Sequence, residues 1–372
     1  MKRILWAIGV VALGFGLGVR ADDPKTKNEK ASDEKKDRAA EWRDIRAEFQ
    51  KLLPEVIREW RSAGSEAERN KALARLDPIT EKAYEFINKA PKDDIVLEAA
   101  IFLLGTRPQP PEAVVKILAE HHLDNEKFAS VLPRLLVHDT PAVQNLLRRA
   151  MEESKNKNVR GIATFSYARS RHEASEVERN SKRAADLVAE AEKMLQKVVK
   201  EFGDVPMGRR TLKEEAEKLL FVINHLSIGK KAPEVVSRDL DDKEVRLSSL
   251  QGKVVVLDIW ATWCGPCRAM IPHEREMVEK LKDRPFVLVS ISADETKETL
   301  KDFLEKESMP WVHWWEGRRE GGILNDWNVQ FFPTIYILDH KGVIRYKNIR
   351  GKEMEEAVVK LLDEMEKGQG SR

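Results

Sequence analysis

Cysteine is the scarcest residue of this 372-residue chain: it has two, three positions apart, in the segment WATWCGPCRAMIP. Two cysteines exclude a framework of several structural disulfides and a zinc site made of four cysteines. A strong excess of one charge is also missing, since 65 basic and 63 acidic residues leave a net charge of +2. That balance argues against a nucleic-acid partner, because such binding needs a dominant basic face.

Long hydrophobic runs are absent beyond the N-terminus. A basic start, MKR, precedes an apolar run over residues 4–19, and Val19 and Ala21 supply the small residues of a cleavage site. This pattern predicts a secretory signal peptide over residues 1–21, with an uncleaved membrane anchor as the alternative. We therefore expect a periplasmic or otherwise extracytoplasmic protein that contacts a membrane only if this segment is retained.

The next two segments differ in apolar content. Residues 22–40 mix both charge signs with almost no large apolar side chain, which predicts a flexible linker. Residues 41–226 carry apolar side chains at spacings of three and four, as in EWRDIRAEFQKLLPEVIREW, between turn signals such as GTRPQPP and FGDVPMG. They predict an all-helical domain, with a solenoid of stacked helix pairs as one arrangement.

From residue 227 onward, strand and helix patterns alternate. KVVVLDIW is a continuous β-branched run of the kind that is buried on both faces of a sheet, and FVLVSIS and PTIYILD are further strands. Helical stretches separate these strands, and the hairpin HKGVIRYKNI and a final helix follow. We expect an α/β domain over residues 227–372, with a central mixed sheet flanked by helices.

The two cysteines lie between the first of these strands and a helical segment. Cys264 stands where the helix should begin, so unpaired backbone N–H groups and the positive helix end would favour its thiolate. Cys267, one turn later, would attack a mixed disulfide formed at Cys264 and release the reduced substrate. The spacing therefore predicts a redox disulfide with Cys264 as nucleophile and Cys267 as resolving residue.

Three other interpretations of the pair are weaker. A zinc site needs four ligands, and neither a second cysteine pair nor a histidine pair with ligand spacing follows. Covalent haem attachment needs histidine directly after the second cysteine, where this chain has Arg268. An inert disulfide would close a loop too short to stabilise the fold much. We expect neither a metal nor a cofactor.

The segment VVVLDIWATWCGPCRAMIP resembles the active-site segment of the thioredoxin superfamily, and residues 227–368 resemble its TlpA-like branch of exported thiol-disulfide oxidoreductases. Four features carry the resemblance: Trp263 before the first cysteine, Gly265-Pro266 between the pair, Pro272 after it, and FFPT downstream. The resemblance implies a thioredoxin-like fold. It also implies an enzyme that exchanges its dithiol with protein thiols and disulfides and draws on an unidentified electron donor.

The resemblance also implies roles for individual residues. Pro333 matches the family's cis-proline, which leaves the backbone of Phe332 free to pair with an extended substrate. Asp258 matches the buried carboxylate that accepts the proton of Cys267. The expected substrate-binding residues are Trp263, Gly265, Pro266, Phe332, Pro333 and Thr334.

Two positions depart from the family pattern, and one segment is unusually aromatic. Many TlpA-like proteins have glutamate where this chain has Met270, so the relay is assigned to Asp258, and the nearby thioredoxin lysine is replaced by Ser290. Alternation in WVHWW places Trp311 and Trp314 on opposite faces of a strand. The aromatic segment MPWVHWWEGRREGGILNDWNVQFFPT contains Trp311, Trp314, Trp315, Trp327, Phe331 and Phe332. Core packing accounts for some of these side chains, and others are expected to form a rim that contacts substrate.

The leading hypothesis is an extracytoplasmic thiol-disulfide oxidoreductase. Its Gly-Pro dipeptide favours a reductase, in cytochrome c maturation or in the antioxidant repair of other exported thiols. A peroxiredoxin-like peroxidase is the first alternative, but a peroxidatic cysteine needs threonine three residues before it, where this chain has Ala261. The second alternative is a helical scaffold that binds a protein partner and carries an accessory redox domain.

Overall fold

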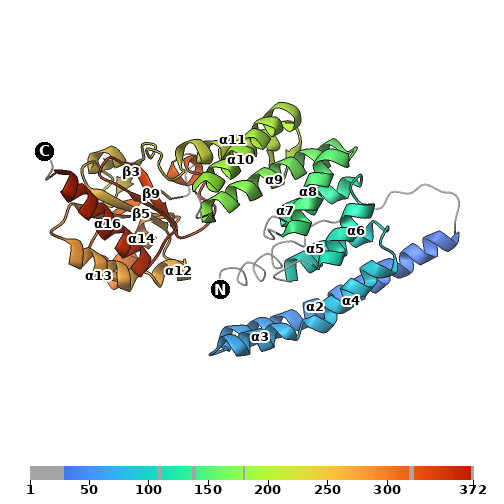
Figure 1. Cartoon of the computed structure of the whole chain (residues 1–372). Helices are drawn as coiled ribbons and strands as arrows, with labels where there is room; N and C mark the ends of the chain where they lie inside the picture. Colours follow the sequence, from blue (N-terminus) through green and yellow to red (C-terminus); the bar gives the residue numbers. More distant parts are fainter. Residues whose placement is uncertain (1–28, 107–110, 136–139, 179–180, 318–321, 370–372) are drawn as a thin grey trace. The chain divides into compact units, whose positions relative to one another are not determined.

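The computed structural model describes residues 29–106, 111–135, 140–178, 181–317 and 322–369 (Figure 1). The chain divides into two compact units, Met1–Ala216 and Glu217–Arg372. The predicted signal peptide lies outside the described residues. Within the described ranges, no helix combines the length and apolar character that crossing a bilayer requires.

The first unit is an array of helices, as predicted. Its elements are α2 (Glu29–Ser62), α3 (Glu66–Ala74), α4 (Asp77–Lys89), α5 (Ile95–Thr106), α6 (Glu112–His121), the 3-10 helix η1 (Glu126–Ser130), α7 (Leu132–Leu135), α8 (Pro141–Glu153), α9 (Lys157–Val177), α10 (Ser181–Phe202) and the short strands β1 (Pro206–Met207) and β2 (Arg210–Thr211). Side-chain caps begin several helices: Thr140 accepts a hydrogen bond from the backbone N–H of Val143, and Asn156 from that of Val159.

Aromatic packing joins the first helices of this unit. Trp42 and Phe49 lie on one face of α2, as their spacing in the sequence predicts, and both are buried. The Trp42 ring stacks on Phe86 of α4 with centroids 5.5 Å apart, and Phe49 meets Phe102 of α5 edge-on at 4.7 Å. The apolar stripe of α2 is therefore covered by two later helices.

Helix α2 extends into the segment that was expected to be a flexible linker. Residues 29–40 are helical, because Glu, Lys, Ala and Arg are strong helix formers even without apolar neighbours. Arg38 also has tertiary partners: its guanidinium donates to the carbonyl of Phe86 at 3.1 Å and forms an ion pair with Asp93 at 2.8 Å. The structure thus differs from the expected linker over residues 29–40.

Helix α11 (Leu212–His225) runs from the first unit into the second, and the division falls within it, after Ala216. This is earlier than the boundary predicted at residue 227. Phe221, Val222 and Leu226 pack in the core of the second unit. The end of this helical pattern therefore belongs to the domain that follows it.

The second unit is built on a seven-stranded mixed sheet in the order β4-β3-β7-β6-β5-β8-β9. Its elements are β3 (Val236–Asp239), β4 (Glu244–Arg246), the 3-10 helix η2 (Leu247–Leu250), β5 (Val254–Trp260), α12 (Gly265–Arg268), α13 (Ile271–Leu281), β6 (Phe286–Ser292), α14 (Lys297–Lys306), β7 (Val312–Trp315), α15 (Ile323–Asp326), β8 (Thr334–Leu338), β9 (Ile344–Lys347) and α16 (Lys352–Gln369). Strands β5, β6 and β7 are parallel, and β8 joins β5 antiparallel. The predicted thioredoxin-like domain, a mixed sheet flanked by helices, is confirmed.

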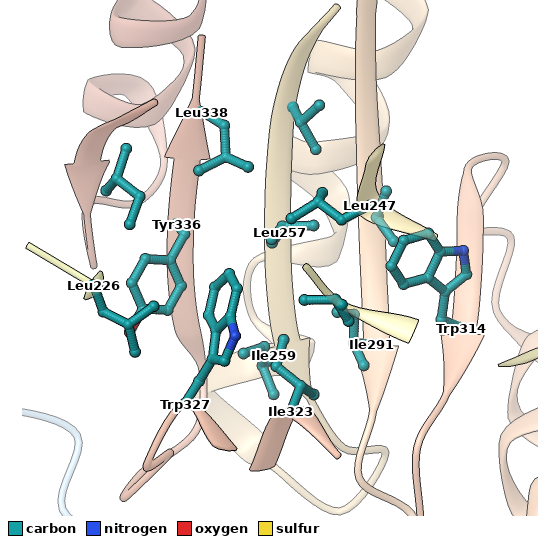
Figure 2. Close-up of a cluster of buried hydrophobic side chains, with 14 residues drawn as sticks. Leu226, Leu247, Leu257, Ile259, Ile291, Trp314, Ile323, Trp327, Tyr336 and Leu338 are labelled. Atoms are coloured by element: carbon teal, nitrogen blue, oxygen red, sulfur yellow. The ribbon is translucent and has the colours of Figure 1, made fainter. Parts of the chain in front are cut away.

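Each face of the sheet has its own apolar layer. Alternate residues of the central strand β5 point to opposite faces. Figure 2 shows one layer, in which Leu257 and Ile259 of β5 pack with Trp327 and Tyr336. The rings of Trp327 and Tyr336 meet edge-on with centroids 4.9 Å apart.

The opposite layer lies beneath helices α13 and α16. It contains Val254 and Val256 of β5, together with Met277 of α13 and Leu361 of α16. Because side chains alternate along β5, Asp258 continues the row of Val254 and Val256 and points to this same face. The sheet thus places the carboxyl group of Asp258 among the apolar side chains of this layer.

Candidate active site

The two cysteines lie just beyond the C-terminal end of β5, where the chain enters α12. They form a disulfide with their Cα atoms 5.3 Å apart. Cys264 is the N-cap residue of α12, and its Sγ accepts a hydrogen bond from the backbone N–H of Cys267 at 3.2 Å. An N–H group directed at this sulfur stabilises a thiolate there when the disulfide is reduced.

The disulfide itself is buried, but its surroundings are exposed. Cys264 is 5% exposed, whereas Trp263 is 62% exposed and the Gly265-Pro266 pair is also exposed. Trp263 meets Phe332 edge-on, with ring centroids 5.6 Å apart. A protein partner therefore meets an aromatic surface directly beside the sulfurs.

The loop that leads to Cys264 is fastened by Asp294, a buried residue that follows β6. Its carboxylate accepts hydrogen bonds from the backbone N–H of Thr262 at 3.1 Å and from the Thr262 hydroxyl at 2.8 Å. The hydroxyl of Ser292 also donates to it, at 2.7 Å. The sequence places Asp294 at the end of this strand and predicts no role for it at the active site. Its position directly after an apolar strand, beside the strand that carries the cysteines, is the signal that would have found it.

The FFPT segment lies next to the disulfide. The Phe332–Pro333 peptide bond is cis, and Phe332 packs against the apolar cluster that contains both cysteines. The Thr334 hydroxyl donates to the carbonyl of Phe331 at 2.6 Å, and Nη2 of Arg350 donates to the carbonyl of Pro333 at 3.1 Å. The structure thus brings the two segments of the expected site together.

Asp258 lies within β5 and is 3% exposed. The sheet register places it beside Ser290 of β6, whose hydroxyl donates to Oδ2 at 3.5 Å, while Oδ1 has no hydrogen-bond partner among the described residues. Burial raises the pKa of Asp258 to about 7, and the Ser290 hydrogen bond and the charge of Arg350 oppose this rise. A carboxyl group in this state exchanges protons at neutral pH.

Two neighbours of Asp258 define its surroundings. Nε1 of Trp311 donates to the Ser290 hydroxyl at 2.9 Å, so the proton of that hydroxyl is left to point at Asp258. Arg350 is the cation that interacts with this carboxylate, and burial lowers the pKa of its guanidinium. Ser290 therefore replaces the expected lysine as a hydrogen-bond donor, and Arg350 replaces it as a charge.

Sequence reasoning missed Glu274, a second carboxyl group of this layer. It lies in the first turn of α13, is 1% exposed, and its Oε1 has no hydrogen-bond partner among the described residues. Burial, and then the charge of Asp258, raise its pKa to about 9. Its spacing from Ile271, Met277 and Leu281 is the signal that would have found it, because these residues share one buried helix face.

The aromatic segment before Pro333 is mostly core. Trp314 and Trp327 are each 2% exposed, and Trp315 donates its indole N–H to a backbone carbonyl. Trp311 packs against the layer opposite to that of Trp314, as the alternation predicts. Of the expected rim, Phe331 is 49% exposed, and Trp311, Trp315 and Phe332 are partly exposed.

Metal ligands do not gather at this site. Among the described residues, no group of three or more His, Cys, Asp or Glu side chains is arranged to hold a metal ion.

Comparison with known proteins assigns the second unit. Residues 228–347 match the AhpC/TSA family. Thiol-disulfide oxidoreductase ResA of Bacillus thuringiensis is 30% identical over 137 residues, which cover 37% of this chain and 78% of that protein. The chain belongs to the thioredoxin-like thiol-disulfide oxidoreductases. Enzymes of this family carry out dithiol-disulfide exchange, and this chain is one of them.

Further relatives of this oxidoreductase have the same description. ResA of Bacillus cereus is 33% identical over 132 residues, covering 35% of this chain and 74% of that protein. Among solved structures, the thioredoxin domain of a thiol-disulfide oxidoreductase from Bacteroides vulgatus is 27% identical, with a TM-score of 0.35; the match covers 37% of this chain and 98% of that chain.

Proposed function

We propose that this oxidoreductase is a reductase of protein disulfides that works outside the cytoplasm. The observation that carries the proposal is the arrangement at the end of β5: a Cys264–Cys267 disulfide at a helix start, Phe332 of the Phe332–Pro333 pair packed against the same apolar cluster, and a buried carboxyl group, Asp258, in the strand that leads to the disulfide. Each of these features serves one part of a thiol-disulfide exchange.

The reaction begins at Cys264. Its thiolate, stabilised by the N–H of Cys267, attacks one sulfur of the substrate disulfide, and the other substrate sulfur leaves as a thiolate. A mixed disulfide then joins Cys264 to the substrate. Cys267 loses its proton to Asp258 and attacks the Sγ of Cys264, so that the second substrate sulfur also leaves as a thiolate. The substrate gains two electrons and the enzyme becomes oxidised.

Substrate recognition is assigned to the surface around the disulfide. The backbone of Phe332, the residue before Pro333, is the proposed partner for an extended peptide. Trp263 and the exposed dipeptide Gly265-Pro266 complete the contact region, while Thr334, also expected there, is buried and donates its hydroxyl to the carbonyl of Phe331. A reduced protein partner must return electrons to the disulfide after each cycle, because the oxidised enzyme holds none to donate.

Direction and location rest on sequence features. The Gly-Pro dipeptide between the cysteines favours reduction, and the basic and apolar start of the chain favours export. The proposed substrates are exported proteins with oxidised cysteine pairs, such as precursors of cytochromes c.

The test uses insulin disulfides as substrate and a small dithiol as electron donor. The Cys264→Ser variant should lose all reduction, whereas Cys267→Ala should accumulate a mixed disulfide with the substrate at Cys264. Reduction by Cys264→Ser at the rate of the native protein would refute the assignment of the nucleophile. A reduction potential far more oxidising than that of thioredoxin, about −270 mV, would reverse the proposed direction.

The peroxidase alternative is tested on the same preparations. Rapid consumption of hydrogen peroxide by reduced protein, without any disulfide substrate, would favour it over disulfide reduction. We expect slow consumption, since Ala261 occupies the position of the peroxidatic threonine.

A further inference from the structure

Two carboxyl groups are buried behind the disulfide with few donors to satisfy them. Asp258 and Glu274 are 3% and 1% exposed. Oδ1 of Asp258 and Oε1 of Glu274 have no hydrogen-bond partner among the described residues, and the donor to Asp258 Oδ2 is the Ser290 hydroxyl at 3.5 Å. This environment does not solvate two negative charges, because each would need several hydrogen bonds or a counter-charge.

The backbone connects Glu274 to the resolving cysteine. The N–H of Met270 donates to the carbonyl of Cys267 at 3.0 Å, and the N–H of Glu274 donates to the carbonyl of Met270 at 3.1 Å. Met270 itself packs in the layer beneath α13 and α16, the layer toward which Asp258 points. Glu274 thus lies two turns beyond Cys267, in electrostatic contact with Asp258.

We propose that Glu274 is a positioning residue for disulfide exchange, which forms with Asp258 a buried pair of carboxyl groups that shares one proton at neutral pH. The pair then presents one negative charge to Cys267 rather than two. Arg350, the cation whose charge acts on Asp258, partly balances this single charge. The inference rests on the proposed function for the role of Asp258 as proton acceptor.

The proton balance of the resolving step follows from this arrangement. When Cys267 attacks the mixed disulfide, its proton passes to the pair, which becomes fully protonated and neutral. The new S–S bond forms between Cys264 and Cys267, and the bond from Cys264 to the substrate sulfur breaks with its electrons on the leaving thiolate. The pair later returns the proton to solvent or to that thiolate, and one proton remains shared.

Other charged and titratable groups around this layer have partners of their own. His273 on α13 faces Glu355 on α16 at 3.6 Å, and Lys280 pairs with the same carboxylate. Tyr346 of β9 packs at the edge of the layer. The charged group that acts on Glu274 is Asp258, and Arg350 acts in turn on Asp258.

The pair is tested first in the oxidised full-length protein, in which no thiol titrates. Carboxyl ¹³C NMR of Asp- and Glu-labelled protein should show two coupled titrations, one near neutral pH and one in the alkaline range. Glu274→Gln should remove one titration and keep the other. Asp258→Asn should shift the titration of Glu274 to lower pH, because the neighbouring negative charge is gone. Glu276→Gln, an exposed position of the same helix, is the matched control and should change neither.

The outcome that overturns the pair is clear in this experiment. If Glu274 titrates like an exposed glutamate, it shares no proton with Asp258. The same holds if its titration does not change in Asp258→Asn. This readout does not depend on catalysis, so it separates a failure of the pair from a failure of the proposed reductase. Glu274→Leu, which suits an apolar helix face, replaces Glu274→Gln if that variant does not fold.

The functional readout is the release of the second thiolate from an aromatic disulfide by the reduced protein. At pH 7, Glu274→Gln should stay within about twofold of the native rate, because the pair already carries one charge. Above pH 9, this variant should be faster than the native protein by about threefold or more, because the native pair then loses its shared proton and the second charge opposes ionisation of Cys267. Native and variant profiles that remain parallel at every pH would rule out the positioning role.

Discussion

The two layers of the sheet differ in what they bury. The layer of Leu257, Trp327 and Tyr336 is built from apolar side chains that pack on one another, whereas the layer beneath α13 and α16 also encloses Asp258 and Glu274. Apolar burial stabilises a fold, while an unpaired carboxyl group in the same setting destabilises it. The first layer therefore stabilises the domain. The buried carboxyl groups of the second layer lower the stability of the fold at the point where the proposed reaction needs proton transfer to and from a thiol.

The largest effect should come from opening the apolar layer. Trp327→Ala removes a ring that is 2% exposed and packs edge-on against Tyr336, so it should lower the free energy of unfolding by about 3–5 kcal/mol. Urea denaturation followed by circular dichroism measures this. Phe331→Ala, a control at a half-exposed aromatic position, should change stability little. An ordinary substitution costs about 1 kcal/mol. A smaller loss in Trp327→Ala would mean that neighbouring side chains move into the cavity and fill it.

The next effect concerns chemistry rather than stability. Asp258→Asn removes the proposed proton acceptor and should slow the resolving step about 10²-fold at pH 7, the lower end of what a general base contributes. The first attack by Cys264 should be much less affected, so mixed disulfide should accumulate transiently. Rapid-quench trapping of that species is the measurement, and equal slowing of both steps would contradict the assignment.

The third prediction concerns stability against pH. Folding raises the pKa of Glu274 from 4.5 to about 9, so the folded protein keeps a proton that the unfolded chain loses. The stability contributed by this group is complete below about pH 4.5 and falls as pH rises toward 9. Glu274→Leu should therefore be more stable than the native protein at pH 8, by about 1–3 kcal/mol, and the difference should shrink at pH 5. Urea denaturation at both pH values checks this, and a difference that is constant with pH would contradict it.

The smallest expected effect concerns Arg350, the cation that acts on Asp258 in the charged layer. Its charge lowers the pKa of Asp258, so Arg350→Gln should raise that pKa and shift the pH profile of the resolving step to higher pH, by about half a unit to one unit. Lys347→Gln, which removes a nearby cation that lies over the ring of Tyr336, serves as the control. Equal shifts of this pH profile in both variants would contradict a specific effect of Arg350 on Asp258.

Sequence patterns predicted the apolar layer better than the charged one. The β-branched runs predicted β5, β6 and β8. The alternation in WVHWW predicted that Trp311 and Trp314 lie on opposite faces, as they do. Both predictions succeed because the side-chain period and the burial of a strand are local properties of its sequence. The resemblance to thioredoxins supplied Asp258, which the structure buries within β5, and Pro333, whose neighbour Phe332 packs against the cysteines. Their roles in the reaction remain predictions.

The missed residues have a common cause. Glu274 stands in HEREMVEK, where charged neighbours suggest a solvated face, and only its phase relative to Ile271 and Met277 shows that it points inward. Arg350 comes from a loop far along the chain and meets Asp258 only through tertiary folding. The low apolar content of residues 29–40 predicts a linker, but their high helix propensity extends α2 over them.

The attachment of the loop through Thr262 to Asp294 has a consequence for adaptation. The restraint acts upstream of Cys264, and a Cβ at Gly265 would have no heavy atom within 4 Å of it. Gly265 can therefore carry a side chain without disturbing the frame that holds the sulfurs. Natural variation or laboratory selection at this position can retune the reduction potential of the enzyme while the rest of the scaffold stays the same.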